Sequence, residues 1–181
     1  MGASARVFRG LAGLGLLEPV TPELQQDAVS ERLWRSLSAL DRFRARFDRV
    51  PESLTNPVLL GCLLVPLGFS LDGGHPSREG GRRWLGDLPV ARRDVERLYQ
   101  VLALQRRLRD RNISPRAARA VIARGAFADA LTWLDVHGQA PDDVARWREL
   151  VSDLEASGAL TEVRREPYRR RRRRPRRSPP Q

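Results

Sequence analysis

The residues with the clearest chemistry in this chain are arginines close to its C-terminal end. Residues 164–181 contain ten arginines, six of them consecutive, and a single acidic residue. Such a segment repels itself and has almost no apolar surface to bury, so we expect it to be disordered and to bind a phosphate backbone. The predicted RNA-binding residues are Arg164, Arg165, Tyr168, Arg169, Arg170, Arg171, Arg172, Arg173, Arg174, Arg176 and Arg177. Tyr168 is either a ring on which an unpaired base stacks or simply a solvent-exposed ring.

The excess positive charge belongs almost entirely to this tail. Residues 1–163 carry 23 arginines against 21 acidic residues, whereas residues 164–181 carry ten arginines against Glu166, which together give the net charge of +11. Lysine is absent, which codon usage rich in G and C would also explain. The clustering of the arginines, more than their identity, therefore indicates a polyanionic partner.

Residue types that could do other chemistry are few and scattered. His75, His137 and the single Cys62 do not have the short spacings of a zinc site, and no serine or cysteine has a basic partner at a recognisable spacing. We expect His137, at a helix end, to interact as a cation with the negative end of the helix dipole. The sequence thus predicts no catalytic residues and no metal site.

The elements that must position these residues are predicted to be helices. Apolar residues recur at helical spacing in segments that end or begin at glycine, proline or capping residues, which predicts six or seven helices and no strand. The predicted segments are 7–14 with a stop at Gly15, 33–47, 58–65 after Thr55 as a cap, 88–112, 114–122 capped by Ser114, 127–137 and 141–157. Residues 72–87 are rich in glycine and predict a loop.

Two of these helices have distinctive patterns. The helix at 58–65 is apolar on every face and should be central and buried, with Cys62 as a small buried hydrophobe. The helix at 33–47 is amphipathic, and its aromatic residues are predicted to pack in the core rather than to stack on bases. Its apolar face comprises Leu33, Trp34, Leu37, Leu40, Phe43 and Phe47, and most of its arginines lie on the other side: Arg32, Arg35, Arg42, Arg46 and Arg49.

The chain is long enough for one ordinary core, so we expect a single helical domain at residues 1–163 followed by the tail at 164–181. The apolar run at 57–71 is shorter than a membrane span and contains Pro66. The apolar residues at 11–17 are interrupted by glycine and lack a cleavage site for export. These features predict a compact all-α protein of the cytoplasm with no membrane partner.

The order of these segments resembles a known family. The segments that carry the resemblance are 5–8 (ARVF) with 15–17 (GLL), 33–42 (LWRSLSALDR), the apolar stretch 59–67, 127–134 (FADALTWL) and the arginine tail. Together they are similar to the C-terminal portion of bacterial poly(A) polymerases, in the tRNA nucleotidyltransferase superfamily. The resemblance spans essentially the whole chain as a succession of helices, although no single stretch is a sharp motif.

This resemblance implies a helical body that grips single-stranded RNA in a sequence-tolerant way beside a nucleotidyltransferase head. In that family the head transfers AMP from ATP to an RNA 3′ hydroxyl with two Mg²⁺ ions held by paired carboxylates. This chain has no such carboxylate pair on a strand-like segment, and Arg92-Arg93-Asp94 lies within a helical pattern, where we interpret it as a solvated helix face. We therefore expect no cofactor in this chain and no activity from the chain alone; a separate head would complete the enzyme.

Two other interpretations of the tail stay open at this point. It could tether a free-standing adaptor to RNA, to ribosomes or to an acidic partner, or it could bind anionic lipid. An adaptor would owe all of its binding to residues 164–181, which distinguishes it from a helical body that also grips RNA.

Overall fold

A computed structural model describes residues 3–19, 21–25, 27–69, 71 and 90–158. These residues form seven α-helices and one short 3₁₀ helix, and the described ranges contain no β-strand. The all-α fold predicted from the helical periodicity is therefore confirmed. The glycine-rich stretch 72–87 and the whole arginine tail at 164–181 lie outside the described residues.

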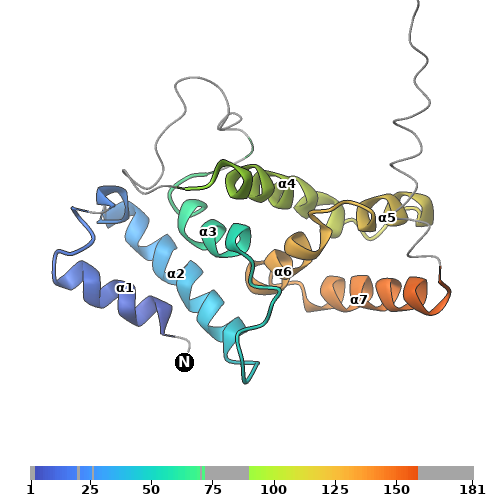
Figure 1. Ribbon diagram of the computed structural model, residues 1–181, viewed down its shortest axis with the longest axis horizontal. Coiled ribbons are helices and arrows are strands. Elements are labelled where there is room, and N and C mark those ends of the chain that lie inside the picture. The colour runs from blue at the N-terminus through green and yellow to red at the C-terminus, as the bar shows by residue number, and fades with distance from the viewer. Residues whose placement is uncertain (1–2, 20, 26, 70, 72–89, 159–181) are drawn as a thin grey trace, which may run out of the picture.

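The helices pack around α6, which lies in the middle of the molecule. In chain order they are α1 (Ser4–Gly13), η1 (Pro22–Gln25), α2 (Asp27–Arg44), α3 (Asn56–Leu64), α4 (Arg92–Leu108), α5 (Pro115–Ile122), α6 (Phe127–His137) and α7 (Pro141–Ala156). Figure 1 shows α1 beside α2 at one end of the body and α5 with α7 at the other. Helix α6 contacts α2, α3, α4 and α7, so it joins the two ends.

Local capping signals place several helix ends where the sequence predicts them. The Ser114 hydroxyl oxygen accepts a hydrogen bond from the backbone N–H of Ala117 at 3.3 Å, and Pro115 opens α5. Gly15 follows α1 with φ of +69°, a left-handed conformation that glycine adopts without strain. These boundaries depend on neighbouring residues alone, which is why sequence reasoning finds them.

The aromatic stripe predicted on α2 is only partly in the core. Phe43 is 4% exposed, but α2 ends at Arg44, so Phe47 lies beyond the helix and is 40% exposed. Its ring still packs on Phe43 with centroids 5.3 Å apart. Trp34 is half-buried, and the Arg9 guanidinium lies 5.5 Å from the centre of its ring. The prediction that Phe47 is a core residue is wrong.

Helix α4 differs in detail from the prediction. The predicted segment runs from 88 to 112, whereas the helix spans Arg92–Leu108, and Leu104 is among its buried residues. Arg92 and Arg93 lie in its first turn with exposed side chains, which agrees with the interpretation of Arg92-Arg93-Asp94 as a helix face.

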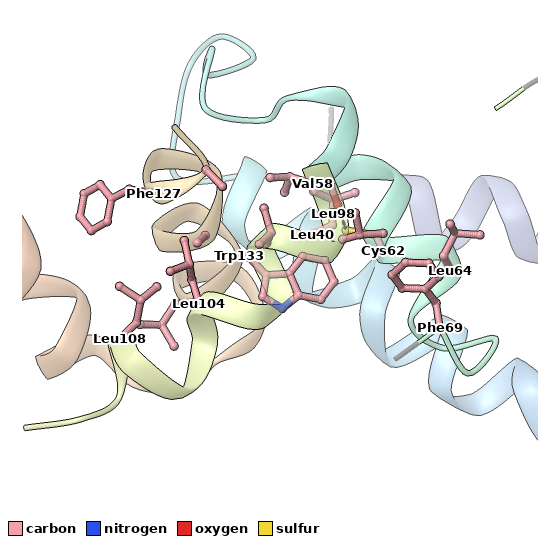
Figure 2. Packing of buried hydrophobic residues seen from close by; sticks show 14 of the residues in the cluster. Leu40, Val58, Cys62, Leu64, Phe69, Leu98, Leu104, Leu108, Phe127 and Trp133 are labelled. Atoms are coloured by element: carbon pink, nitrogen blue, oxygen red, sulfur yellow. Dashed lines mark hydrogen bonds between the residues drawn. The ribbon is translucent and has the colours of Figure 1, made fainter. Parts of the chain in front are cut away.

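One apolar core connects the helices. Figure 2 shows side chains of α3, α4 and α6 meeting around Trp133. Cys62 and Val58 of α3 are fully buried there, as predicted for the central helix, although Leu59 on the same helix is 38% exposed. At the far end, the indole N–H of Trp147 donates to the backbone carbonyl oxygen of Leu108 at 2.8 Å, so the buried ring leaves no unsatisfied donor.

Buried or half-buried carboxylates connect helices that are distant in sequence. Both oxygens of Asp41 accept hydrogen bonds from the first backbone N–H groups of α1, those of Ser4 at 2.9 Å and Ala5 at 3.0 Å. Asp129 of α6 accepts from the hydroxyl of Thr55 at 2.9 Å and from Nε of Arg97 at 2.6 Å. Thr55 does occupy the N-cap position of α3, but its hydroxyl makes this tertiary bond in place of the predicted cap.

Candidate nucleic-acid interface

The RNA-binding residues predicted from the sequence all belong to the tail and lie outside the described residues. They are Arg164, Arg165, Tyr168, Arg169–Arg174, Arg176 and Arg177. Their place relative to the helical body is therefore not described. The structure does reveal a second concentration of arginines, on the body itself, which the sequence did not single out.

This second concentration surrounds a cavity between α2, α4 and α6, which we call the arginine cavity. Its volume is about 380 Å³, within the usual range of ligand pockets. The cations that line it are Arg32, Arg35 and Arg42 of α2 and Arg109 just after α4. The described residues that line it include no aspartate or glutamate. The local electrostatic potential therefore favours an anion.

The three arginines of α2 reach the cavity because of their spacing. Positions 32, 35, 39 and 42 follow one another by three or four residues and so share one face of the helix, on which Ala39 leaves room between the cations. The core-facing residues Leu33, Leu37 and Leu40 are buried on the other side. The sequence predicted this division into an apolar face and an arginine side, but assigned no function to the arginine side.

Among the side chains that the structure describes, most of the cavity cations have no carboxylate partner. Arg35 pairs with Glu31 at 2.7 Å, one turn earlier on α2, and both side chains are exposed. The guanidinium groups of Arg32, Arg42 and Arg109 make no ion pair with any carboxylate in the described part of the chain. Exposed pairs such as Arg35–Glu31 are weak and exchange easily, so all four cations can turn to an anionic ligand.

The floor of the cavity is apolar and aromatic. The rings of Trp133 and His137 pack against each other with centroids 4.1 Å apart and planes tilted by 43°. The remaining apolar lining residues are Ala39, Val65, Pro66 and Val136. Gln105, at the cavity wall, donates from its amide nitrogen to the carbonyl oxygens of Val101 and Ala130, both at 3.0 Å, and so ties α4 to α6.

His137 and Cys62 meet beneath this floor, with Nε2 of the imidazole 3.4 Å from Sγ of the thiol. Burial lowers the pKa of His137 to about 4 and raises the pKa of Cys62 to about 12. Both groups are therefore neutral near pH 7, so the pair provides no thiolate nucleophile. The prediction that His137 acts as a cation at its helix end is wrong, because this burial keeps it uncharged.

The buried carboxylates of the body serve packing and are unsuited to hold the Mg²⁺ ions of a polymerase head. Asp129 pairs with Arg97 at 2.6 Å, Asp135 with Arg148 at 2.6 Å and Asp143 with Arg111 at 3.2 Å. Within the described ranges, no three His, Cys, Asp or Glu side chains come close enough together to hold a metal ion. No helix there combines the length and the apolar character that a membrane span requires.

Comparison with known protein families, with characterised proteins and with solved structures gives no match. The resemblance to poly(A) polymerases therefore rests on the order of the helices and on the tail.

Proposed function

We propose that this chain is the RNA-binding C-terminal portion of a poly(A) polymerase-like nucleotidyltransferase. It grips RNA for 3′ polyadenylation in the cytoplasm and lacks the catalytic head, which would hold ATP and Mg²⁺. The observation that carries the proposal is the arginine cavity: four arginines line one cavity of the helical body, with no acidic residue among the described lining residues, in a chain that ends in ten further arginines.

The binding mechanism follows from the chemistry of arginine. A guanidinium group donates hydrogen bonds to two phosphate oxygens at once and stays charged at every physiological pH. Each arginine that engages a phosphate releases a condensed counterion, so affinity falls as salt rises. Phosphates occur at every nucleotide, and the grip is therefore tolerant of sequence.

The alternative is a free-standing adaptor tethered to RNA or ribosomes by its tail. It would need no cationic site on the body. The comparison that separates the two uses the full-length chain and a full-length variant in which the ten tail arginines are replaced by glutamine. Residual, salt-dependent affinity of this variant for single-stranded RNA supports the poly(A) polymerase-like grip; complete loss of binding supports the adaptor.

The coding DNA upstream of Met1 gives an independent test of the family. An open frame encoding a strand-rich segment with paired aspartates would make this chain the back half of a polymerase. A stop codon followed by a ribosome-binding signal would favour the adaptor.

A further inference from the structure

We propose that the arginine cavity binds a nucleoside phosphate, with the base on its apolar floor and the phosphates on its arginine rim. This inference rests on the proposed function and deepens it, because it places a second RNA site on the body, separate from the C-terminal tail. The same groups would also bind a free nucleotide, and competition with AMP distinguishes a free nucleotide from a nucleotide within an RNA strand.

The apolar residues that line the cavity indicate that the ligand has a base as well as a phosphate group. A site for phosphate alone requires only cations and N–H donors, whereas this cavity is also lined by the half-buried Val65 and by Pro66 and Trp133, which are largely buried. Base rings gain binding energy on aromatic and apolar side chains irrespective of sequence. A volume of about 380 Å³ also leaves room for more than a phosphate group.

The spacing of the arginines around the cavity favours a nucleic-acid strand over a single phosphate group as the ligand. Arg32 and Arg42 are ten residues apart on α2, a rise of about 15 Å along the helix axis. Arg109 faces them from the end of α4. This spread exceeds one phosphate group and suits the successive phosphates on either side of one nucleotide.

A base can reach the floor only when it is unpaired. In a duplex the base faces are stacked on their neighbours, and turning one out costs unstacking and unpairing energy. The arginine cavity should therefore prefer single-stranded RNA to a duplex of the same sequence, whereas a purely electrostatic tail should bind the more highly charged duplex at least as well.

The test uses the full-length chain with its ten tail arginines replaced by glutamine, so that the body alone binds. The probe is a short labelled single-stranded RNA, followed by fluorescence anisotropy. Adding Arg32→Gln, Arg35→Gln, Arg42→Gln and Arg109→Gln should weaken binding by at least about tenfold and reduce the salt slope by up to about 3. A matched control replaces Arg6, Arg116, Arg119 and Arg124, which are exposed and removed from the cavity, and should change affinity by less than about threefold.

A second variant tests the floor without altering charge. Val65→Phe adds bulk at a half-buried lining position and should weaken single-stranded RNA binding while the cations stay in place. Circular dichroism and urea unfolding of each variant establish that it is folded.

The outcomes separate this inference from the proposed function. If the unmodified full-length chain fails to bind RNA, the proposed function itself is wrong. If that chain binds but the folded cavity variant and the control variant lose equal affinity, only the cavity inference is overturned. If AMP displaces the labelled RNA as effectively as an unlabelled oligonucleotide does, the site belongs to free nucleotides. If the unlabelled oligonucleotide displaces the labelled RNA and AMP does not, the site belongs to RNA.

Discussion

Gly61 packs directly against the indole ring of Trp133: a Cβ atom added at position 61 would lie 2.5 Å from Cζ3 and 3.0 Å from Cη2 of that ring. The added atom would also lie 2.8 Å from Cδ1 of Leu98 on α4. Helices α3, α4 and α6 therefore meet at a point where only a residue without a side chain fits. Since Trp133 also lines the arginine cavity, this close packing helps to set the shape of that cavity.

Replacing Gly61 with alanine should destabilise the protein. The extra methyl group must displace two buried side chains, and overpacking of this kind costs about 1–3 kcal/mol of unfolding free energy. Urea unfolding followed by circular dichroism measures the change. The matched control is Gly10→Ala on α1, where an added Cβ meets nothing within 4 Å and helix propensity should raise stability by up to about 1 kcal/mol. Equal changes in unfolding free energy for Gly61→Ala and Gly10→Ala would contradict the close packing at Gly61.

His137 should make the fold sensitive to acid. Burial holds its pKa at about 4 in the folded chain, against 6.5 for an exposed histidine, so between these values the unfolded chain binds a proton that the folded chain does not. The neutral imidazole contributes its full stability above pH 6.5 and loses it as the pH falls toward 4. The shift corresponds to a loss on the order of 3 kcal/mol.

The variant His137→Gln isolates this effect from the titration of carboxylates, which both proteins share. The free energy of unfolding of the native chain should fall more steeply than that of the variant between pH 6.5 and 4. Parallel curves over this range would show that His137 is not buried as described.

Asp129→Ala should remove an anchor that joins three parts of the fold. The carboxylate accepts from Thr55 before α3 and from Arg97 on α4, and hydrogen bonds to a charged group contribute about 1.5–3 kcal/mol. We expect a loss in that range from urea unfolding, and a smaller loss, about 1 kcal/mol, for Thr55→Val. An Asp129→Ala protein as stable as the native chain would contradict the anchoring role.

The chain by itself should not extend RNA. Primer extension with ATP and Mg²⁺ requires paired carboxylates for the metal ions, and Asp129, Asp135 and Asp143 are each committed to arginine partners. Incubation of the purified chain with a labelled primer, analysed on a denaturing gel, should show no added nucleotides. A lengthened primer would reveal an active site that the proposed function does not contain.

Features encoded by neighbouring residues could be predicted from the sequence, and features made by distant residues could not. The start of α5 at Ser114-Pro115 and the left-handed Gly15 follow from local capping chemistry. Thr55 carries the same local signal, yet its hydroxyl binds Asp129, 74 positions further along the chain. Nothing local to Thr55 indicates that partner.

The arginine cavity was missed for the same reason. The arginines of α2 have the spacing of one face of an amphipathic helix, and on most such helices the polar face simply meets solvent. Only the packing of α2 beside α6 and the end of α4 places Trp133 and Arg109 across from them. A signal was nevertheless present: Arg32, Arg35 and Arg42 surround the small residue Ala39 on one face of the helix, and of these arginines Arg35 has Glu31 as its partner.

The salt dependence of RNA binding by the full-length chain tests the central claim most directly. If about six of the tail arginines engage phosphates at once, a plot of log affinity against log salt concentration should have a slope of about −4, and cavity arginines that also bind would make it steeper. Fluorescence anisotropy with labelled single-stranded RNA over a range of KCl concentrations gives this slope. An affinity that does not change with salt, or no affinity for RNA at low salt, would contradict the account.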